Sequence, residues 1–237
     1  MGNDTFEIEY AALMDRNPEG TYLYIPQSFR KFHPGSVGFF DESGAWNEVA
    51  DVSKADQPDE FTAFTGKLSY DDEETMEWKT RSSEGESGNN IRASAGLSAA
   101  AASAVPVDVS VEGKHKTSSS KKAALVAKSA VMKKRYKPPF DPRVQPWVNE
   151  NAKVLMEGDW ARYIKANGLW AIQSTWVTDE CAIKMTNKTD NSLEAGLDVA
   201  ATGIGKVGGG GGTFDKLENE GWTTYKSNGV SLTITLP

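Results

Sequence analysis

The stretch from Ile91 to Val111 alternates with a period of two over 21 residues, and it constrains the fold more than any other feature of the chain. Its odd positions are apolar except for Ser103, and its even positions are small or polar. This period predicts β-strand rather than helix, because successive side chains of a strand point to opposite faces. The length exceeds an ordinary strand of about 5–6 residues and also the roughly 9–11 tilted residues that cross a bilayer.

Two interpretations of this stretch stay open. In the first, it forms one or two ordinary strands whose odd face is buried in a soluble core. In the second, it is a membrane hairpin. Pro106 has no amide N–H to donate to a strand ladder, so it predicts a break. The arms would then run from about Ile91 to Ala102 and from Val107 onwards, each near the length that crosses a bilayer.

A basic tract follows the alternating stretch directly. Residues 113–140 hold nine basic side chains and no acidic one, although the whole chain has a net charge of −7. The positive field is therefore local. Such a cluster favours anionic lipid, because each Lys or Arg near that surface contributes on the order of 1 kcal/mol. The candidate lipid-binding residues are Lys114, Lys116, Lys121, Lys122, Lys133, Lys134, Arg135 and Lys137.

Signals for catalysis or for a cofactor are weak. The chain has one cysteine, Cys181, and two histidines, which are few candidates for a zinc site or for a Cys-His catalytic pair. Residues 203–208 formally match GxGxxG, but more glycines follow where a phosphate site needs a helix N-terminus. We interpret them as a flexible linker within a hairpin. We therefore expect no enzyme activity, no metal, no cofactor and no small-molecule substrate.

The N-terminal part predicts a helix, two strands and an exposed loop. A helix capped by Asp4 or Thr5 places Phe6, Tyr10, Leu13 and Met14 on one face, and its first turn is acidic. Residues 21–26 and 36–40 read as strands. The loop between them carries aromatic and basic side chains together, which suits either a membrane-interface anchor or an ordinary solvated loop. The candidate anchor residues are Phe29, Arg30, Lys31 and Phe32.

The C-terminal half predicts helices over residues 144–156 and 160–167, the second capped by Asp159 and ended at Asn167-Gly168. Residues 170–185 read as extended chain. A second alternating stretch covers residues 193–202, and a half-buried strand closes the chain at 230–236. We expect one α+β domain over residues 1–237, with a twisted, mostly antiparallel sheet and packed helices. The sequence has no run of 18 apolar residues and no signal-peptide pattern, so we expect a cytoplasmic protein.

The order of these elements resembles the gasdermin pore-forming domain, and most of all the gasdermin-like regulator-of-cell-death proteins of filamentous fungi. The resemblance rests on the N-terminal helix, TYLYIP leading to GSVGFF, and the small-residue stretch before Lys-rich sequence. It continues through the helical block to a second, Gly-interrupted stretch that ends in GVSLTITLP. It implies a pyroptosis-like cell-death effector that binds acidic phospholipids, oligomerises and permeabilises the plasma membrane.

The resemblance also implies that two β-hairpins, within residues 85–135 and 170–237, refold into a transmembrane β-barrel built by many protomers. A closed barrel satisfies every strand backbone group in lipid, whereas monomeric insertion leaves open edges. The candidate membrane-inserting residues are Ile91, Ala93, Ala95, Leu97, Ala99, Ala101, Val105, Val107, Val109, Val111, Leu193, Ala195, Leu197 and Val199.

Two departures from the family bear on regulation. The first helix is acidic where many relatives carry a basic one, and the sequence given ends at its last strand without a repressor domain. The fungal likeness implies activation by a divergent allelic homologue in heterokaryon incompatibility, with a homo-oligomer or hetero-oligomer as the product. The main alternative is a soluble β-rich module that binds glycans or lipids. A nucleic-acid binder using residues 114–137 is disfavoured by the acidic remainder of the chain, so we expect no nucleic acid.

Overall fold

The computed structural model describes residues 6–17, 19–54, 56–78, 80–83, 85–86, 121–128, 130–187, 189, 193, 195–197, 200, 211–227 and 232–236. In these residues helices pack on sheets, and the paired strands are antiparallel. The expected α+β class with a mostly antiparallel sheet is therefore confirmed. The alternating stretch from Ile91 to Val111 lies outside the described residues, as do Lys114, Lys116 and Val199.

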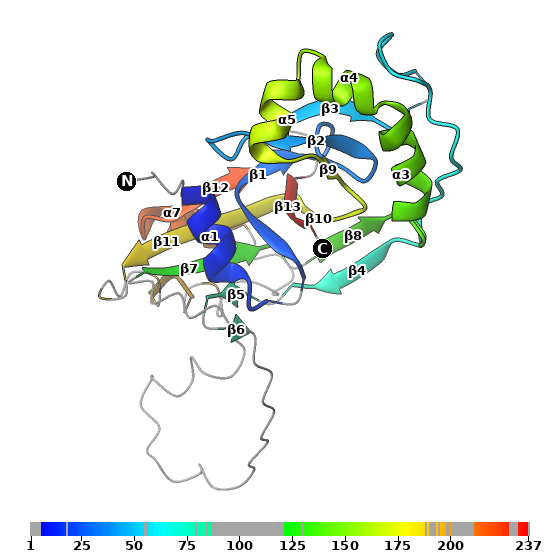
Figure 1. Ribbon diagram of the computed structural model, residues 1–237. Helices are drawn as coiled ribbons and strands as arrows, with labels where there is room; N and C mark the ends of the chain where they lie inside the picture. Colours follow the sequence, from blue (N-terminus) through cyan, green and yellow to red (C-terminus); the bar gives the residue numbers. More distant parts are fainter. Residues whose placement is uncertain are drawn as a thin grey trace, which may run out of the picture.

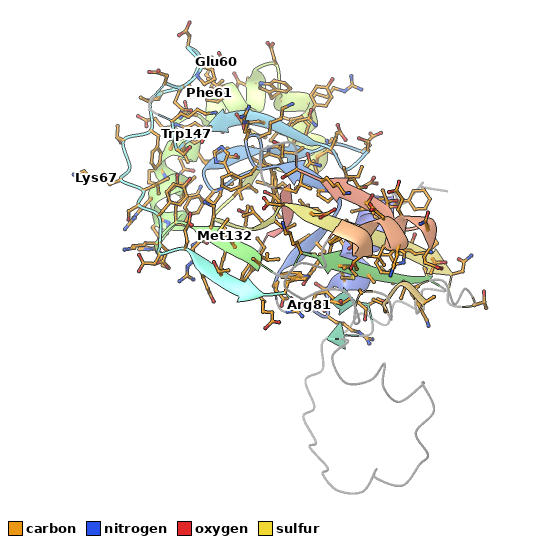
Figure 2. All side chains as sticks on the ribbon, turned by 180° about the vertical axis from the view of Figure 1, so that it is seen from behind. Glu60, Phe61, Lys67, Arg81, Met132 and Trp147 are labelled. Carbon is orange, nitrogen blue, oxygen red and sulfur yellow. The ribbon has the colours of Figure 1, made fainter. Side chains whose placement is uncertain are left out.

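Two five-stranded sheets contain most of the strands (Figure 1). The first has the order β1 (Thr21–Ser28), β13 (Leu232–Leu236), β10 (Ser174–Thr178), β8 (Ala130–Arg135) and β4 (Glu74–Glu77). The second has the order β12 (Thr223–Lys226), β11 (Glu180–Asn187), β7 (Lys121–Ala127), β5 (Arg81–Ser82) and β6 (Gly85–Glu86). Figure 2 labels one residue of each sheet, Met132 on β8 and Arg81 on β5.

The two sheets share consecutive strands of the chain: β7 is followed by β8, and β10 by β11, and each pair has one strand in each sheet. β8 pairs with β10 in the first sheet, and β7 pairs with β11 in the second. At the junction the Lys128 N–H donates to the Glu180 carbonyl oxygen over 2.9 Å, so the pairing continues between the two sheets. The four strands therefore form one long antiparallel ribbon, which twists through the molecule (Figure 1).

Both faces of the β7–β11 pair are covered. The odd-numbered residues of β7 pack against Tyr10 and Met14 of α1 (Phe6–Met14). The even-numbered residues, Ala124 and Val126, pack against Phe214 and other side chains from α7 (Gly211–Asn219). A strand covered on both sides has no solvent face, which explains why KKAALVA lacks polar–apolar alternation after its two lysines.

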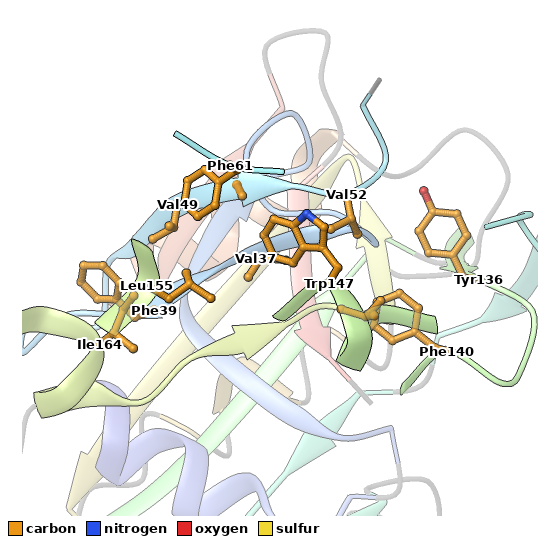
Figure 3. Packing of buried hydrophobic residues seen from close by; sticks show 12 residues of the cluster. Val37, Phe39, Val49, Val52, Phe61, Tyr136, Phe140, Trp147, Leu155 and Ile164 are labelled. Atoms are coloured by element: carbon orange, nitrogen blue, oxygen red, sulfur yellow. The ribbon is translucent and has the colours of Figure 1, made fainter. Parts of the chain in front are cut away.

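A second packing unit joins a three-stranded sheet to three helices. The sheet has the order β3 (Trp46–Asp51), β2 (Ser36–Phe40) and β9 (Trp170–Ala171). The helices are α3 (Asp141–Glu150), α4 (Ala152–Glu157) and α5 (Ala161–Asn167). Figure 3 shows Trp147 and Leu155 facing Val37 and Phe39, and the Trp147 indole N–H donates to the Thr62 carbonyl oxygen over 2.8 Å.

The helices at residues 144–156 and 160–167 were predicted correctly in type, but the predicted cap was wrong. Trp160, not Asp159, is the N-cap of α5, and it makes no side-chain capping bond. The predicted end of the helix is confirmed, because α5 ends at Asn167; its C-cap Gly168 has a φ of 79°, a value that favours glycine, but lies outside the αL region.

The prediction of a strand at residues 193–202 is wrong where the structure describes that stretch. Residues 193, 195–197 and 200 are helical. Leu193, Leu197 and Ala200 are buried together against α7, a helix that the sequence analysis missed. Leu193 and Leu197 are four residues apart, so they fit a period of 3.6 as well as a period of two. We call residues 193, 195–197 and 200 together with α7 the helical cover.

Candidate functional site

The strand that follows the first alternating stretch and the strand that precedes the second are paired with each other. Lys121, the first residue of β7, is the register partner of Asn187, the last residue of β11. The first alternating stretch, residues 91–111, precedes Lys121 in sequence, and the second, residues 193–202, follows Asn187. Strands that extended beyond these two residues would therefore already be neighbours in one antiparallel ladder.

The other end of the first region is held in the same sheet. β6 ends at Glu86 and pairs with β5, which pairs with β7. β5 is fastened by a buried ion pair between Arg81 and Glu19, and the Arg81 guanidinium also lies 5.0 Å from the centre of the Trp78 ring. Burial raises the pKa of Glu19, but hydrogen bonds from Arg81 and Tyr22 outweigh it, so the pKa is lowered overall. Glu19 is thus held ionised, as its pairing with Arg81 requires.

Several cations of the basic tract are paired with carboxylates from distant segments. Lys121 lies 2.5 Å from Glu9 on α1, and Lys134 lies 2.5 Å from Glu73. Arg135 donates to Asp71, with an Nη2–Oδ2 distance of 2.6 Å. The hydrogen bond from Arg135 is the main reason that the pKa of Asp71 is lowered. In this structure, therefore, three of the candidate lipid-binding cations are matched by acids.

The remaining described cations of the tract have varied surroundings. Lys133 lies opposite Glu74 in the β4–β8 ladder, with its ammonium 5.0 Å from the centre of the Trp176 ring. Lys122 lies opposite Thr186 on β11, and Lys137 is exposed just beyond β8. Ion pairs at partly exposed positions contribute only about 0–1 kcal/mol each. The acids of α1 and of residues 71–74 therefore mask the cations without fixing them strongly.

The described candidate inserting residues belong to the helical cover. Leu193 and Leu197 are buried against Phe214 and Trp222, whereas Ala195 is exposed. A Cβ atom at Gly196 would lie 2.0 Å from Trp222 Nε1, so only glycine permits this approach. Leu193 and Leu197 therefore face protein in this structure, and the cover must leave the sheet before they can contact lipid.

The candidate anchor loop is only partly exposed. Phe32 is 0% exposed, and its ring lies 4.8 Å from the Trp46 ring in an edge-on contact. The prediction that it is available to a membrane is wrong for this structure, because it fills the small core between β1 and the β2–β3 hairpin. Phe29 is half-buried with the Lys134 ammonium 5.5 Å from its ring centre, and Arg30 and Lys31 are exposed.

A histidine network that the sequence analysis did not predict fixes the other end of this loop. His33 Nε2 lies 3.3 Å from Asp51 Oδ2, and His33 Nδ1 lies 2.9 Å from the Pro34 carbonyl oxygen. Burial lowers the pKa of His33, but the bonds to Asp51 and Pro34 outweigh it, so the pKa is raised. Since both ring nitrogens are occupied, the histidine joins β3 to the loop and has no nitrogen left for base catalysis.

In the residues that the structure describes, no group of three or more His, Cys, Asp or Glu side chains could hold a metal ion. The helices of that same part include none that is both long and apolar enough to cross a membrane. A scan against protein-family models gave no match, and searches of curated proteins and of solved structures gave none either. The function must therefore be argued from the residues and their geometry.

Proposed function

We propose that this protein is a pore-forming cell-death effector. In this proposal it binds acidic phospholipids through its basic strands, oligomerises, and inserts two β-hairpins to permeabilise the plasma membrane. It acts in the manner of the gasdermin-like fungal proteins that its sequence resembles. Activation then comes from a divergent allelic homologue or from self-association.

The register pairing of Lys121 with Asn187 carries the proposal. In the chain, one alternating stretch precedes β7 and the other follows β11, and β7 and β11 are hydrogen-bonded neighbours. Extension of both strands past this pair would lengthen an existing ladder, so no new strand order is needed within the protomer. A barrel wall requires this continuity, because its backbone groups have no water to bond in the hydrocarbon region.

Two features of the folded protein oppose insertion and must change first. The carboxylates of Glu9, Glu73 and Asp71 occupy the cations that would meet lipid headgroups. The helical cover buries Leu193 and Leu197, which would have to convert from helix to strand. An acidic membrane favours the first change, because its phosphates compete for the same cations. The acidic first helix thus becomes part of the inactive state.

Dye leakage from liposomes tests this function. The full chain, with any required partner, should release dye from vesicles rich in phosphatidylserine and leave pure phosphatidylcholine vesicles intact. Replacement of Lys133, Lys134 and Arg135 by Gln should abolish leakage, while the control Lys153→Gln, Arg162→Gln and Lys165→Gln on the outer helices retains it. Uniform rings in negative-stain images would accompany leakage. Equal leakage from both vesicle types, or an unaffected basic-strand variant, would contradict the proposal.

The soluble alternative, a β-rich module that binds glycans or lipids, draws support from one different observation. A groove beside α1 exposes apolar side chains, among them Trp170. That module requires no change in the helical cover and no ring formation. Saturable ligand binding by a monomer, without leakage from any acidic vesicle, would favour it over the pore.

A further inference from the structure

A groove beside α1 gathers exposed apolar side chains. It lies between α1, β1, the turn from β2 to β3, and β9, and its volume is about 730 Å³. Ile8, Ile25 and Trp170 line it and are 64%, 40% and 43% exposed. Cavities that bind small ligands or short peptide segments usually measure about 300–1,000 Å³. Exposed apolar groups gathered in one hollow are typical of a binding surface.

The charge around this groove has one sign. Glu7, Asp41 and Glu42 are among its lining residues, and none of the described residues that line it is Lys, Arg or His. Asp41 accepts hydrogen bonds from Ser43 in its own turn and from Asn47 on β3. By contrast, Glu7 and Glu42 have no cationic partner among the described residues. The groove is therefore complementary to a ligand that is both apolar and cationic.

The turn between β2 and β3 packs tightly against Glu7 at one wall of the groove. Gly44 in the β2–β3 turn has a φ of 74°, and a Cβ atom there would lie 2.1 Å from Glu7 Cγ. The turn therefore packs directly on the first turn of α1, and any larger residue would push them apart. This contact holds Glu7 in the lining of the groove, beside the turn that carries Glu42.

The floor of the groove follows the edge of a sheet. β1 is the terminal strand of its sheet and pairs only with β13 among the described strands. Five consecutive residues of β1, from Thr21 to Ile25, line the groove, so the groove runs along the strand. The register with β13 is interrupted between Tyr22 and Gln27, where Pro26 lacks an N–H. An edge strand in a groove is the arrangement that accepts an extended peptide as an added strand.

We propose that this groove binds an extended peptide segment with alternating basic and apolar side chains, which adds as a strand to the free edge of β1. Its apolar side chains contact Ile8, Ile25 and Trp170, and its cations face Glu7 and Glu42. This inference does not rest on the pore-forming proposal, because the groove lies on α1 and β1 and not on the basic strands.

Fluorescence anisotropy with labelled hexapeptides tests the inference on the full chain. The probes alternate Lys with Val, Leu or Trp, and each has a counterpart with Glu in place of Lys. At least one Lys peptide should bind more than tenfold tighter than its Glu counterpart. Trp170→Ala, and separately the pair Glu7→Gln and Glu42→Gln, should each weaken binding at least fivefold. The controls Met156→Ala, at another exposed apolar residue, and Glu150→Gln with Glu157→Gln should leave it unchanged.

Backbone methylation separates strand addition from other modes of binding. The same peptide with N-methyl groups on alternate residues keeps its side chains but loses its donors, so its binding should be lost. Equal binding of the methylated peptide, or equal effects of the groove and control variants, would overturn the proposal. The absence of binding by every Lys peptide would also overturn the proposal. If dodecyltrimethylammonium then bound in a Trp170-dependent way, the occupant would be a lipid-like cation.

Discussion

The Lys121 ammonium lies 2.5 Å from the Glu9 carboxylate and 5.2 Å from the centre of the Phe6 ring. The first residue of β7 is thereby tied to the acidic first helix. Lys121 is also the register partner of Asn187, so this contact lies where the strand after the first alternating stretch pairs with the strand before the second. We therefore interpret the acidic first helix as a partner of the basic tract in the folded protein.

Neutralising the masking acids should strengthen binding to acidic membranes. The triple variant Glu9→Gln, Asp71→Asn and Glu73→Gln frees three cations, each worth about 1 kcal/mol near an anionic surface, so the gain should reach up to about 100-fold. Co-sedimentation with phosphatidylserine vesicles measures it. The control Glu150→Gln, Glu157→Gln and Asp159→Asn changes the net charge equally on outer helices and should gain far less. Similar gains for both variants would show that only net charge matters.

Loosening the helical cover should promote leakage more than an equal loss of stability elsewhere. Leu217 on α7 and Leu155 on α4 are both buried in helices, at 0% and 2% exposure. Replacing either by Ala should cost about 2–5 kcal/mol of unfolding free energy. Only Leu217→Ala removes contacts between the cover and the even face of β7, so only that variant should raise the leakage rate. Thermal unfolding supplies the stability comparison, and equal leakage by the two variants would refute a special role for the cover.

The sequence predicted the parts of the fold where one period is clear. The predicted strands at residues 21–26 and 36–40 are found in β1 and β2, and the helices expected over 144–156 and 160–167 from their spacing and the Gly168 signal are found in α3, α4 and α5. Residues 193–200 were misread because Leu193 and Leu197 satisfy both periods. The choice of helix comes from tertiary structure, since the even face of β7 and β11 needs a cover and α7 supplies a partner. Glycines at the start of α7 concealed that helix.

The pairing of charges could not be predicted from the sequence in the same way. The acids Glu9, Asp71 and Glu73 are separated by tens of residues from Lys121, Arg135 and Lys134 in the chain. Strand order decides that β4 lies beside β8 and that α1 lies over β7. Local charge counting therefore gave the composition of the basic tract but not the pairing of its cations. The burial of Phe32 likewise depends on the distant Trp46 and Thr233.

The His33–Asp51 contact should make stability depend on pH. The folded-state pKa of His33 is raised, so its contribution is fully present below the ordinary histidine value of about 6.5 and is lost as pH rises through the folded value. Compared with His33→Gln, the native chain should show its largest advantage in urea unfolding near pH 5.5 and a smaller one near pH 8.5. An advantage that grows with pH would contradict the protonated contact.

The contribution of Asp51 to stability depends on pH in the opposite direction from that of His33. Burial raises the pKa of Asp51, but hydrogen bonds from His33, Lys54 and Ser53 outweigh it and hold that pKa well below its usual range. Its contribution is therefore present above about pH 4 and is lost as pH falls towards the folded value. Asp51→Asn should accordingly lower the free energy of unfolding at pH 6 and lower it much less at pH 2.5. Urea unfolding of the native chain and the variant at both pH values measures the difference.

The central claim is that the two alternating stretches become the wall of a membrane barrel, and a cysteine scan tests it most directly. Single cysteines at positions 91–102, 107–111 and 193–201 in a Cys181→Ala background would each carry an environment-sensitive dye. After acidic liposomes and any activator are added, odd positions should become apolar while even positions stay wet. At 193–201 a helical pattern before lipid should give way to this period of two. A helical period that persists, or no lipid-induced change under conditions that release dye, would contradict the account.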